Sequence, residues 1–371
     1  MRDSAVVQAR EDDGRLGTGA PTIYDVARVA GVSIASVSRV LNEARNTRPD
    51  TRDKVLQAVA ELGFAPDGAA RALSARLKEV VGVIERRPAP PLTGLADDDV
   101  FADEAESLQF HDMINRGIEM SAQVRGFDLL IRSVDIADHQ ADYRTLALAR
   151  KSDGLILHDR LLDDDPLVRL AGQIPIVTLA GVATPATVNV RSDNASGMGE
   201  LASHLLRDHG YRSIGYVSGY ADSPDSRARH DTLAAEAAAT GAEFVSGPDW
   251  QGNYYAAGGA QVIDRLLDAG TTLPRAIVCA NDQTALGVMG ALRRHGIDVP
   301  TRVAVTGFDD IAMARHLRCQ LTTVRQQIRE LGATAFELVY SMISHVVPPE
   351  RDIVLPTRLV IRESCGCGAG V

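Results

Sequence analysis

A run of small hydrogen-bonding side chains with a single cation begins at residue 33. Hydroxyls, one methyl group, one guanidinium and one amide recur there within ten residues, and apolar side chains fill the positions between them. Groups of this size and polarity can approach a phosphate backbone closely and reach base edges in duplex DNA. The side chains with this chemistry are Ser33, Ala35, Ser36, Ser38, Arg39 and Asn42. They can act together only if one element exposes them on the same face.

The surrounding residues predict two short helices joined by a tight turn. Thr22 followed by Asp25 resembles a capping box, and apolar residues then recur at helical spacing until Gly31 breaks the pattern. Ser33 can cap a second helix over 34–41. Helices of about eight residues are unstable alone, so a third helix must complete a core.

The segment 47–64 has the apolar periodicity of that third helix. The result is a helix-turn-helix within a three-helix unit. An ordinary three-helix bundle would have the same core, but the exposed face of small polar side chains favours a DNA-reading surface. Residues 35–78 carry eight basic and five acidic side chains, a balance of +3 in a chain of formal net charge −10. The side chains predicted to face inward from the third helix are Val55, Leu56, Ala58, Val59 and Leu62.

From residue 80 onward, short apolar runs such as "VVGVI", "AIVCAND" and "VAVTGFDD" alternate with helical stretches. This alternation predicts parallel sheets covered on both faces, and the length fits two units of about five or six strands each. Ligands in this fold class bind at the carboxyl ends of the strands. Four of the helical stretches are predicted at 113–125, 194–209, 255–269 and 283–295.

The chain from Thr22 to about Gly366 resembles the lac-repressor (LacI/GalR) family. The likeness is carried by T-I-x-D-V-A-x-x-A-G-V-S-x-A-S-V-S-R-V-L-N, by "TRDKVLQAVAELGFAP" and by "AARAL". It implies an N-terminal all-α helix-turn-helix head and an α/β, two-lobed, periplasmic-binding-protein-like effector domain with two doubly wound parallel sheets. It also implies a sequence-specific DNA-binding transcriptional repressor whose operator affinity is controlled by a small-molecule effector bound between the lobes.

The resemblance divides the chain into a tail, a head, a hinge helix and an effector domain. These are expected at 1–21 (disordered), 22–66, 67–78 and 79–371, the last of which also forms the dimer. The chain is expected to cross between the lobes near 190, 321 and 351. The first lobe would then contain about 80–189 and 322–350, and the second about 190–321 and 351–366.

The same resemblance assigns the DNA contacts. Arg39 stands at the usual arginine of the recognition helix, and Ile34 and Ala35 stand where the family varies its first base-reading side chains. Leu73 matches the hinge-helix leucine that wedges into the minor groove, whereas Asp67 replaces the usual asparagine after the preceding proline. The implied DNA-binding set is Thr22, Tyr24, Ser33, Ile34, Ala35, Ser36, Ser38, Arg39, Asn42, Arg48, Arg71 and Leu73.

Loops after strands supply the expected effector contacts. Arg229 follows the "SGYADSP" loop, Asn281 follows "AIVCA", and Trp250, the sole tryptophan, lies in a Gly/Pro-bounded loop. Trp250 offers an apolar face, and the other side chains offer bidentate hydrogen bonds. A ligand that consists of a ring flanked by hydroxyls satisfies both, so a sugar is the predicted effector. Packing of Trp250, an ion pair of Arg229 and a helix-capping role for Asp282 are the alternative interpretations. The implied effector-binding set is Phe110, Arg229, Trp250, Asn281, Asp309 and Gln326.

No motif indicates an enzyme, a cofactor or a metal. In "GYVSG" the serine is one place late for G-x-S-x-G, and Cys365-Gly-Cys367 lacks a second close-spaced pair of ligands. No run of eighteen apolar residues predicts a membrane span, and residues 1–21 lack the apolar core of a signal peptide. A reducing cytoplasm is therefore the expected compartment. Residues 97–106 carry six acids and are expected to form a surface loop near the ligand entrance.

The expected partners are a near-palindromic double-stranded DNA operator, a small-molecule effector that is predicted to be a sugar, and a second copy of the chain. The residues after 361 contain no leucine heptads, so a homodimer is expected and a coiled-coil tetramer is not. Two alternatives stay open. One is a sugar-binding module without DNA function, and the other is a corepressor-type regulator that responds to a nucleobase or another metabolite.

Overall fold

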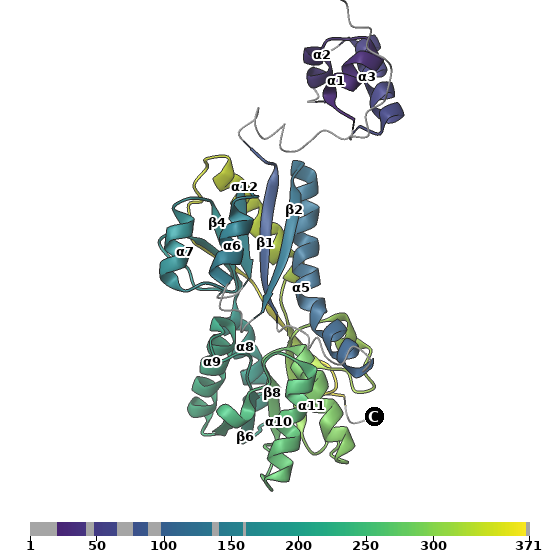
Figure 1. Ribbon diagram of the computed structural model, residues 1–371. Helices are drawn as coiled ribbons and strands as arrows, with labels where there is room; N and C mark the ends of the chain where they lie inside the picture. The colour runs from purple at the N-terminus through teal and green to yellow at the C-terminus, as the bar shows by residue number, and fades with distance from the viewer. Residues whose placement is uncertain are drawn as a thin grey trace, which may run out of the picture. The chain divides into compact units, whose positions relative to one another are not determined.

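The computed structural model describes residues 21–41, 48–64, 77–87, 98–135, 141–158 and 161–368. The chain divides into two compact units, Met1–Lys78 and Glu79–Val371 (Figure 1). Within the described residues, no helix has both the length and the apolar character needed to cross a membrane.

The described residues of the first unit form three helices around a small core. The helices are α1 (Ile23–Ala30), α2 (Ile34–Leu41) and α3 (Pro49–Leu62). Thr22 and Asp25 form the predicted capping box, and the hydrogen bonds from Thr22 lower the pKa of the Asp25 carboxyl to about 2. The core side chains, one stripe from each helix, are Val26, Ala27, Ala30, Val37, Val40, Val55 and Ala58.

One predicted core residue of this unit lies outside the core. Leu56 is 46% exposed, whereas Val55 and Ala58 are buried and Val59 and Leu62 pack against the core. Residues 55, 58, 59 and 62 follow the i, i+3, i+4, i+7 spacing of one helix face, and position 56 is rotated about 100° from it. The prediction that Leu56 faces inward is therefore wrong, because the buried face of α3 is too narrow to include both of the adjacent apolar residues Val55 and Leu56.

Gly31 ends α1 in the left-handed conformation, with φ of 64°. We expect Gly31→Ala to destabilise the first unit by about 1–2 kcal/mol, because a Cβ is unfavourable at this φ although the surrounding space is open. Amide hydrogen exchange over residues 22–41 of the full chain is the measurement. Exchange should accelerate there and stay unchanged in the second unit, and equal protection of residues 22–41 in both proteins would contradict the prediction.

The second unit contains two six-stranded sheets, each with helices on both faces (Figure 1). The first sheet has the order β11-β5-β4-β3-β1-β2 and the second has the order β12-β10-β9-β8-β6-β7. All strand pairs are parallel except β10 with β12. The first-sheet strands are β1 (Val80–Arg87), β2 (Asp128–Asp135), β3 (Gly154–His158), β4 (Ile176–Leu179), β5 (Val188–Ser192) and β11 (Asp352–Leu355). The second-sheet strands are β6 (Ser213–Val217), β7 (Glu243–Val245), β8 (Ala276–Cys279), β9 (Ala304–Asp309), β10 (Thr322–Arg325) and β12 (Arg358–Val360).

We call the first sheet with its helices lobe 1 and the second with its helices lobe 2. In lobe 1 the core between sheet and helices contains fully buried side chains such as Val83 and Phe336, and in lobe 2 it contains Tyr216 and Ile277. The helices of lobe 1 are α5 (Asp98–Arg125), α6 (Ala141–Ala149), α7 (Asp164–Ala171) and α12 (Ile328–Ile343). Those of lobe 2 are α8 (Asn194–Ser203), the π-helical turn η1 (His204–Asp208), α9 (Pro224–Thr240), η2 (Pro248–Trp250), α10 (Ala256–Asp268), α11 (Asp282–Arg294) and η3 (Ala312–Arg315).

The chain passes between the lobes three times, at positions shifted from those expected. The passages follow β5, β10 and β11, so they lie at residues 193, 326–327 and 356–357. The expected boundaries at 321 and 351 placed β10 in lobe 1 and β11 in lobe 2, and the sheet order reverses both assignments. Short apolar strands of either sheet look alike in the sequence, so the boundary had no local signal.

Residues 98–106 of the acidic segment are helical rather than a loop. Helix α5 begins at Asp98 and continues to Arg125. The segment contains neither glycine nor proline, and acidic residues in a first turn are favourable near a helix N-terminus. The expected surface loop is therefore wrong from residue 98 onward.

Candidate functional site

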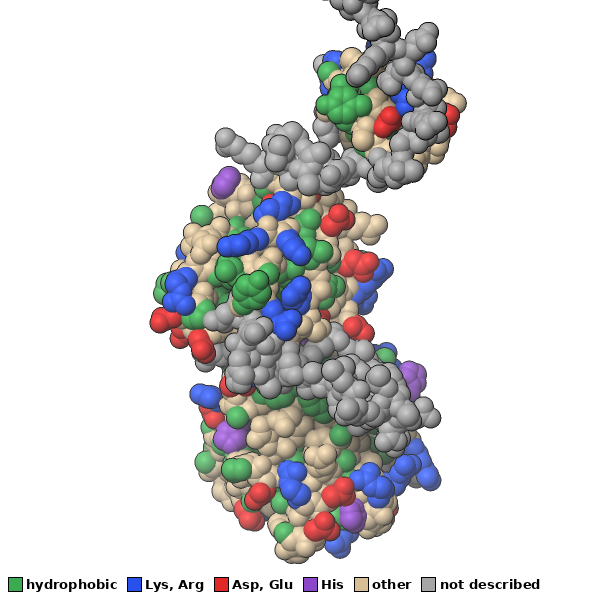
Figure 2. Space-filling view, in the orientation of Figure 1, with side chains coloured by type: hydrophobic (Ala, Val, Ile, Leu, Met, Phe, Trp, Pro, Cys, Tyr) green, Lys and Arg blue, Asp and Glu red, His purple; other side chains and the backbone are tan. Residues whose placement is uncertain are grey.

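The exposed face of the first unit contains most of the predicted DNA contacts. Tyr24 is 68% exposed, Ile34 is 42% exposed, and Ala35 and Arg39 are exposed as well. Figure 2 shows hydrophobic and basic side chains together on the visible face of this unit. Helix α2 thus presents an apolar side chain, Ile34, and a basic one, Arg39, to solvent, which are side-chain types that can contact base edges.

Local hydrogen bonds fix the geometry of α2. The Ser33 hydroxyl accepts from the Ser36 N–H at 3.2 Å, and the two hydroxyls lie 2.9 Å apart, so Ser33 caps the helix as predicted. The Arg39 Nε donates to the Ala35 carbonyl at 3.1 Å, which holds one edge of the guanidinium against the helix while the residue stays exposed.

The other predicted DNA contacts are exposed, half-buried or outside the described residues. Thr22 and Arg48 are exposed, and Arg48 precedes Pro49 at the first turn of α3 without a side-chain capping hydrogen bond. Ser38 is half-buried on α2. Asn42, Arg71, Leu73 and residues 67–76 of the hinge helix expected at 67–78 lie outside the described residues, and the described residues 77 and 78 are not helical.

In lobe 2, Arg229 on α9 is the centre of a buried polar network. It is 3% exposed, and its guanidinium lies 3.6 Å from the centroid of the Phe308 ring. Its Nε donates to the Asn194 Oδ1 at 2.8 Å, and one terminal nitrogen donates to the Ala280 carbonyl at 2.6 Å. Asn194 in turn donates to the buried Asp225, whose carboxylate lies 3.5 Å from the guanidinium. Burial raises the pKa of Asp225, and Arg229 opposes that effect.

A second buried chain of hydrogen bonds begins at Asp309, the last residue of β9. Its carboxylate accepts from the Gln326 amide at 2.5 Å, and the Gln326 carbonyl oxygen accepts from the Ser192 hydroxyl at 2.5 Å. Burial raises the pKa of Asp309 to about 7, while Arg229 and Gln326 act in the opposite direction. Ser192 ends β5 and Gln326 follows β10, so this chain joins two of the three passages between the lobes.

An ion pair connects the carboxyl end of β1 in lobe 1 to the loop after β6 in lobe 2. The Arg86 guanidinium lies 2.6 Å from the Asp222 carboxylate and 5.8 Å from the centroid of the Tyr220 ring. On the lobe 1 side, Glu85 is fully buried and accepts a hydrogen bond from Asn115. Polar groups of both lobes therefore meet at strand ends, which is where ligands bind in this fold class.

Comparison with known proteins identifies the family. The profile of "Bacterial regulatory proteins, lacI family" matches residues 22–67, and that of "Periplasmic binding protein-like domain" matches residues 203–365. The HTH-type transcriptional regulator GalS of Salmonella typhimurium is 32% identical over 326 residues, 85% of this chain and 88% of that protein. The chain belongs to the LacI family of bacterial regulatory proteins.

Other LacI-family members match over a still larger share of the chain. The HTH-type transcriptional repressor PurR of Vibrio parahaemolyticus is 29% identical and covers 92% of this chain and 98% of its own length. A structure of the lac repressor dimer bound to operator and the anti-inducer ONPF superposes with a TM-score of 0.75 at 25% identity, covering 94% of this chain and 99% of that one. The regulator CelR in complex with cellobiose gives a TM-score of 0.62 at 27% identity, covering 93% and 99%. This LacI-family chain is thus a DNA-binding transcriptional regulator, not an enzyme, and the alternative of a sugar-binding module without DNA function is excluded.

Two sequence assignments in this LacI-family chain need correction. Asp282 was expected to cap α11, but Asn281 is the capping residue and accepts from the Thr284 N–H at 3.0 Å. Asp282 is fully buried instead, and its carboxylate accepts from the Thr323 hydroxyl at 2.6 Å and the Ile311 N–H at 2.9 Å. Asn281 also donates to a backbone carbonyl at 3.1 Å, so both ends of its amide already have protein partners.

Trp250 packs in the core rather than beside Arg229. A Cβ at Gly215 would lie 2.5 Å from its indole ring, whereas the next residue of β6, Tyr216, hydrogen-bonds to Ser226 of α9. Consecutive strand residues point to opposite faces of a sheet, so the indole lies on the face away from α9. Trp250 is 6% exposed, and the packing alternative explains its burial.

An aromatic residue that was not predicted as a ligand contact, Tyr254, interacts electrostatically with Arg229. Tyr254 hydrogen-bonds through its hydroxyl with Ser223 at 2.7 Å, accepts from Asn281 at its backbone carbonyl, and packs against Gly219. Burial raises the pKa of Tyr254 well above its ordinary value. The sequence signal for this residue was the tyrosine pair Tyr254-Tyr255, which follows Trp250 closely in the same loop. Only the tryptophan of this loop was assigned to the effector site. Phe110 is half-buried on α5 of lobe 1 beside His111.

Proposed function

We propose that this regulator binds a neutral sugar or sugar derivative between the two lobes, next to Arg229 and Asp309, and that the sugar controls operator affinity. The observation that carries the proposal is the hydrogen-bonded chain from Asp309 through Gln326 to Ser192. It starts at a strand end of lobe 2 and finishes at the passages between the lobes. A ligand that contacts Asp309 can therefore favour one arrangement of the lobes over another.

The charge balance of the site favours a neutral polyhydroxyl ligand. Arg229 is paired with the buried Asp225, and Asp309 adds negative charge as it ionises near pH 7, so an anionic ligand would find no excess of positive charge. Sugar hydroxyls both donate and accept, which suits carboxylates, amides and a guanidinium in one place. Tyr254 supplies the aromatic surface for a sugar ring. The cellobiose complex of CelR supports this ligand class.

A second network supports the link between sensing and lobe arrangement. Asn194, which binds both Arg229 and Asp225, begins α8 immediately after the first passage. The passage residue Asp193 accepts at its backbone carbonyl from Thr357 of the third passage at 2.8 Å. The first two passages thus contain or adjoin residues that contact the proposed site, and the third passage is hydrogen-bonded to the first. The coupling free energy between effector binding and operator binding is typically about 1–3 kcal/mol.

The DNA-binding half of the proposal places α2 in the major groove. Ile34, Ala35 and Arg39 would reach base edges, and Thr22, Ser33, Ser36 and Arg48 would position the unit on the phosphates. Tyr24, Ser38 and the hinge contacts at Asn42, Arg71 and Leu73 complete the proposed set. The operator complex of the lac repressor dimer supports a homodimer on a near-palindromic site. Such a regulator acts where its operator lies, so we propose the cytoplasm as its compartment.

The proposed effector class is tested with the full-length protein and a panel of ligands. A thermal-shift screen of neutral sugars, sugar phosphates and nucleobases gives candidates, because a ligand at 100 times its Kd stabilises by about 2.7 kcal/mol. Each hit is then titrated by calorimetry with and without an operator duplex selected from a random library. We expect neutral sugars to bind and to change operator affinity. A response to a nucleobase alone would establish the corepressor-type alternative instead.

Breaking the Arg86–Asp222 ion pair should weaken the response to the effector. The pair is partly exposed, so its loss is worth about 0.5–1 kcal/mol, or about two- to fivefold in effector affinity. Calorimetry on Arg86→Ala, Asp222→Ala and the double variant measures the coupling of the two side chains. Arg169→Ala, an exposed arginine of lobe 1, is the control. Additive effects of the two single changes would show that the ion pair does not help to close the lobes.

A further inference from the structure

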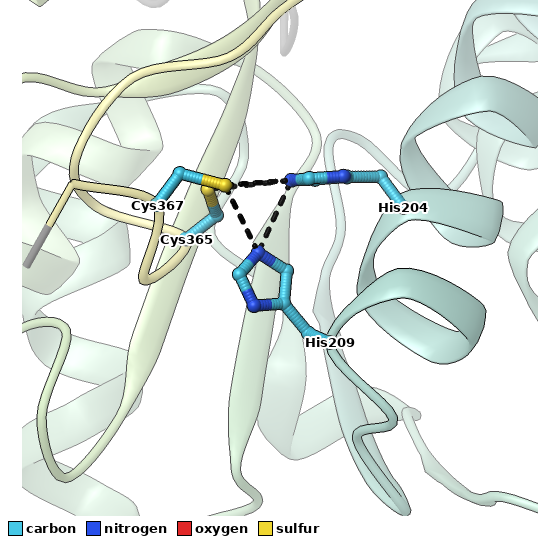
Figure 3. A group of neighbouring side chains, drawn as sticks. All are labelled: His204, His209, Cys365 and Cys367. Carbon is cyan, nitrogen blue, oxygen red and sulfur yellow. Dashed lines mark hydrogen bonds between the residues drawn. The ribbon is translucent and has the colours of Figure 1, made fainter.

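Two histidines and two cysteines gather in lobe 2, away from the residues assigned to the effector. His204 and His209 come from the end of α8 and the turn after it, and Cys365 and Cys367 come from the C-terminal segment (Figure 3). One ligand atom from each of the four lies within 4.8 Å of the other three. His204 and Cys365 are buried, and both cysteines are free thiols. No metal was expected from the sequence, because Cys365-Gly-Cys367 has no second close-spaced pair of ligands beside it. The structure supplies that pair from His204 and His209, and His209 precedes Cys367 by 158 residues.

Four of the six separations between the ligand atoms are close to those of a tetrahedral centre, and the other two are at most 4.8 Å. With Zn–S near 2.3 Å and Zn–N near 2.05 Å, tetrahedral geometry places S and N about 3.6 Å apart and two nitrogens about 3.3 Å apart. The two Nε2 atoms of the histidines are 3.2 Å apart. The Cys367 Sγ lies 3.3 Å from the His209 Nε2 and 3.5 Å from the His204 Nε2, and the Cys365 Sγ lies 3.5 Å from the His204 Nε2.

The local backbone is arranged to bring these side chains together. Helix α8 changes to a π-helical turn at His204, and the His209 N–H donates to the His204 carbonyl at 3.1 Å. The wider turn places residues five apart on the same side, and such turns are frequent at functional sites. On the other segment, Gly366 has φ of 107°, which lets the chain reverse between the two cysteines.

Neighbouring groups hold the ligands in a metal-binding orientation. The His204 Nδ1 lies 3.0 Å from the Asp208 carboxylate. A carboxylate can only accept, so Nδ1 carries the proton and Nε2 keeps its lone pair toward the cluster. The His209 ring stacks on Tyr211 with centroids 5.1 Å apart, and the Tyr211 hydroxyl donates to the Cys365 carbonyl at 2.7 Å. Carboxylate and carbonyl partners of this kind orient the ligands of metal sites.

We propose that His204, His209, Cys365 and Cys367 bind one Zn²⁺ ion in a closed, structural site. Two imidazoles and two thiols favour zinc over the hard cations that prefer oxygen. On binding, both thiols lose their protons to solvent, so two thiolates balance the charge of the ion. Four protein ligands leave no open position for a substrate, which makes the site structural.

The zinc would fasten the C-terminal segment to α8. That segment also braces the second sheet, since the Ser364 hydroxyl donates to the Val305 carbonyl of β9 at 2.6 Å and accepts from the Thr322 N–H of β10 at 2.8 Å. Helix α8 begins directly after the first passage between the lobes, and β12 follows the third. The site thus ties together the lobe 2 ends of two passages, and its loss should loosen the segment after β12.

Metal analysis of the purified full-length protein tests the proposal. We expect about one zinc per chain by mass spectrometry, and titration of metal-free protein with Co²⁺ should give the thiolate charge-transfer and d–d bands of a tetrahedral site. Saturating Zn²⁺ should raise the Tm of metal-free protein by about 5 °C or more. The Cys367→Ser and His209→Gln variants should lose the metal, whereas the control variants Cys319→Ser and His316→Gln should keep it.

Three outcomes would overturn the zinc site. The first is metal-free wild-type protein that gives no tetrahedral Co²⁺ spectrum, a measurement that does not depend on how any variant folds. The second is full zinc content in both Cys367→Ser and His209→Gln, which would place the ion elsewhere. The third is a Cys365–Cys367 disulfide that forms even with Zn²⁺ present, detected as a two-dalton loss in the C-terminal peptide. Each readout is independent of DNA and effector binding.

Discussion

Arg39→Ala is expected to abolish operator-specific binding. An arginine–base contact is worth about 1–3 kcal/mol, and a homodimer loses one in each half-site, so specific affinity should fall by about 30-fold to 10⁴-fold. The side chain is exposed, and its recorded protein contact is one hydrogen bond to Ala35 within α2, so the change should leave the fold intact. Fluorescence anisotropy with a labelled operator duplex is the measurement.

A matched control separates base reading from general charge. Arg293→Ala removes an exposed arginine from α11 of lobe 2 and should bind operator like the wild type. Residual non-specific binding by Arg39→Ala should keep its dependence on salt, because phosphate contacts are retained. Wild-type affinity of Arg39→Ala for the selected operator would show that α2 does not read the site.

Asp309→Asn is expected to reduce sugar affinity by about 10- to 150-fold while operator binding without sugar is preserved. The size follows from replacing a charged acceptor of a hydroxyl hydrogen bond by a neutral one, worth about 1.5–3 kcal/mol. Asparagine keeps the acceptor for Gln326, so the chain to Ser192 is retained. Calorimetry with the sugar identified in the screen measures the loss, and unchanged sugar affinity would remove Asp309 from the site.

The raised pKa of Asp309 adds a dependence on pH. Its folded-state pKa of about 7 lies above the ordinary 3.8, so its contribution to stability is present below about pH 4 and is lost as the pH rises through about 7. A sugar that prefers the carboxylate should bind more tightly as the pH rises through the same range. Asp309→Asn should remove both slopes. A wild-type sugar affinity that is flat between about pH 6 and about pH 8 would contradict this role.

The first unit was predictable because its signals are local. The capping box at Thr22, the break at Gly31 and the cap at Ser33 each depend on residues within four positions. The alternation of strands and helices in the second unit follows from the same short-range periodicity. Sheet membership does not, since β10 and β11 are apolar strands whose partners lie far away in the sequence. The three passages were therefore expected, but two were placed several residues early.

The site residues show the same limit. Arg229 and Asp309 lie at strand ends where the fold class places ligand contacts, but Trp250 packs on the other face of the sheet, which sequence position alone could not show. The four residues of the proposed zinc site have no close spacing across the two segments, and a π-helical turn unites the histidines. Contacts between residues that are far apart in the sequence can be recognised only when the folded structure is known.

The most direct test of the account is one anisotropy experiment on the selected operator duplex. Wild type, Arg39→Ala and Asp309→Asn are titrated with and without saturating sugar, and free-protein sugar affinities are measured in parallel by calorimetry. The account predicts that Arg39→Ala loses the operator but binds sugar like the wild type. It predicts that Asp309→Asn binds the operator but needs about 10- to 150-fold more sugar than wild type for the same response. Loss of both activities in either variant would contradict the separation of DNA reading by α2 from sensing at Asp309.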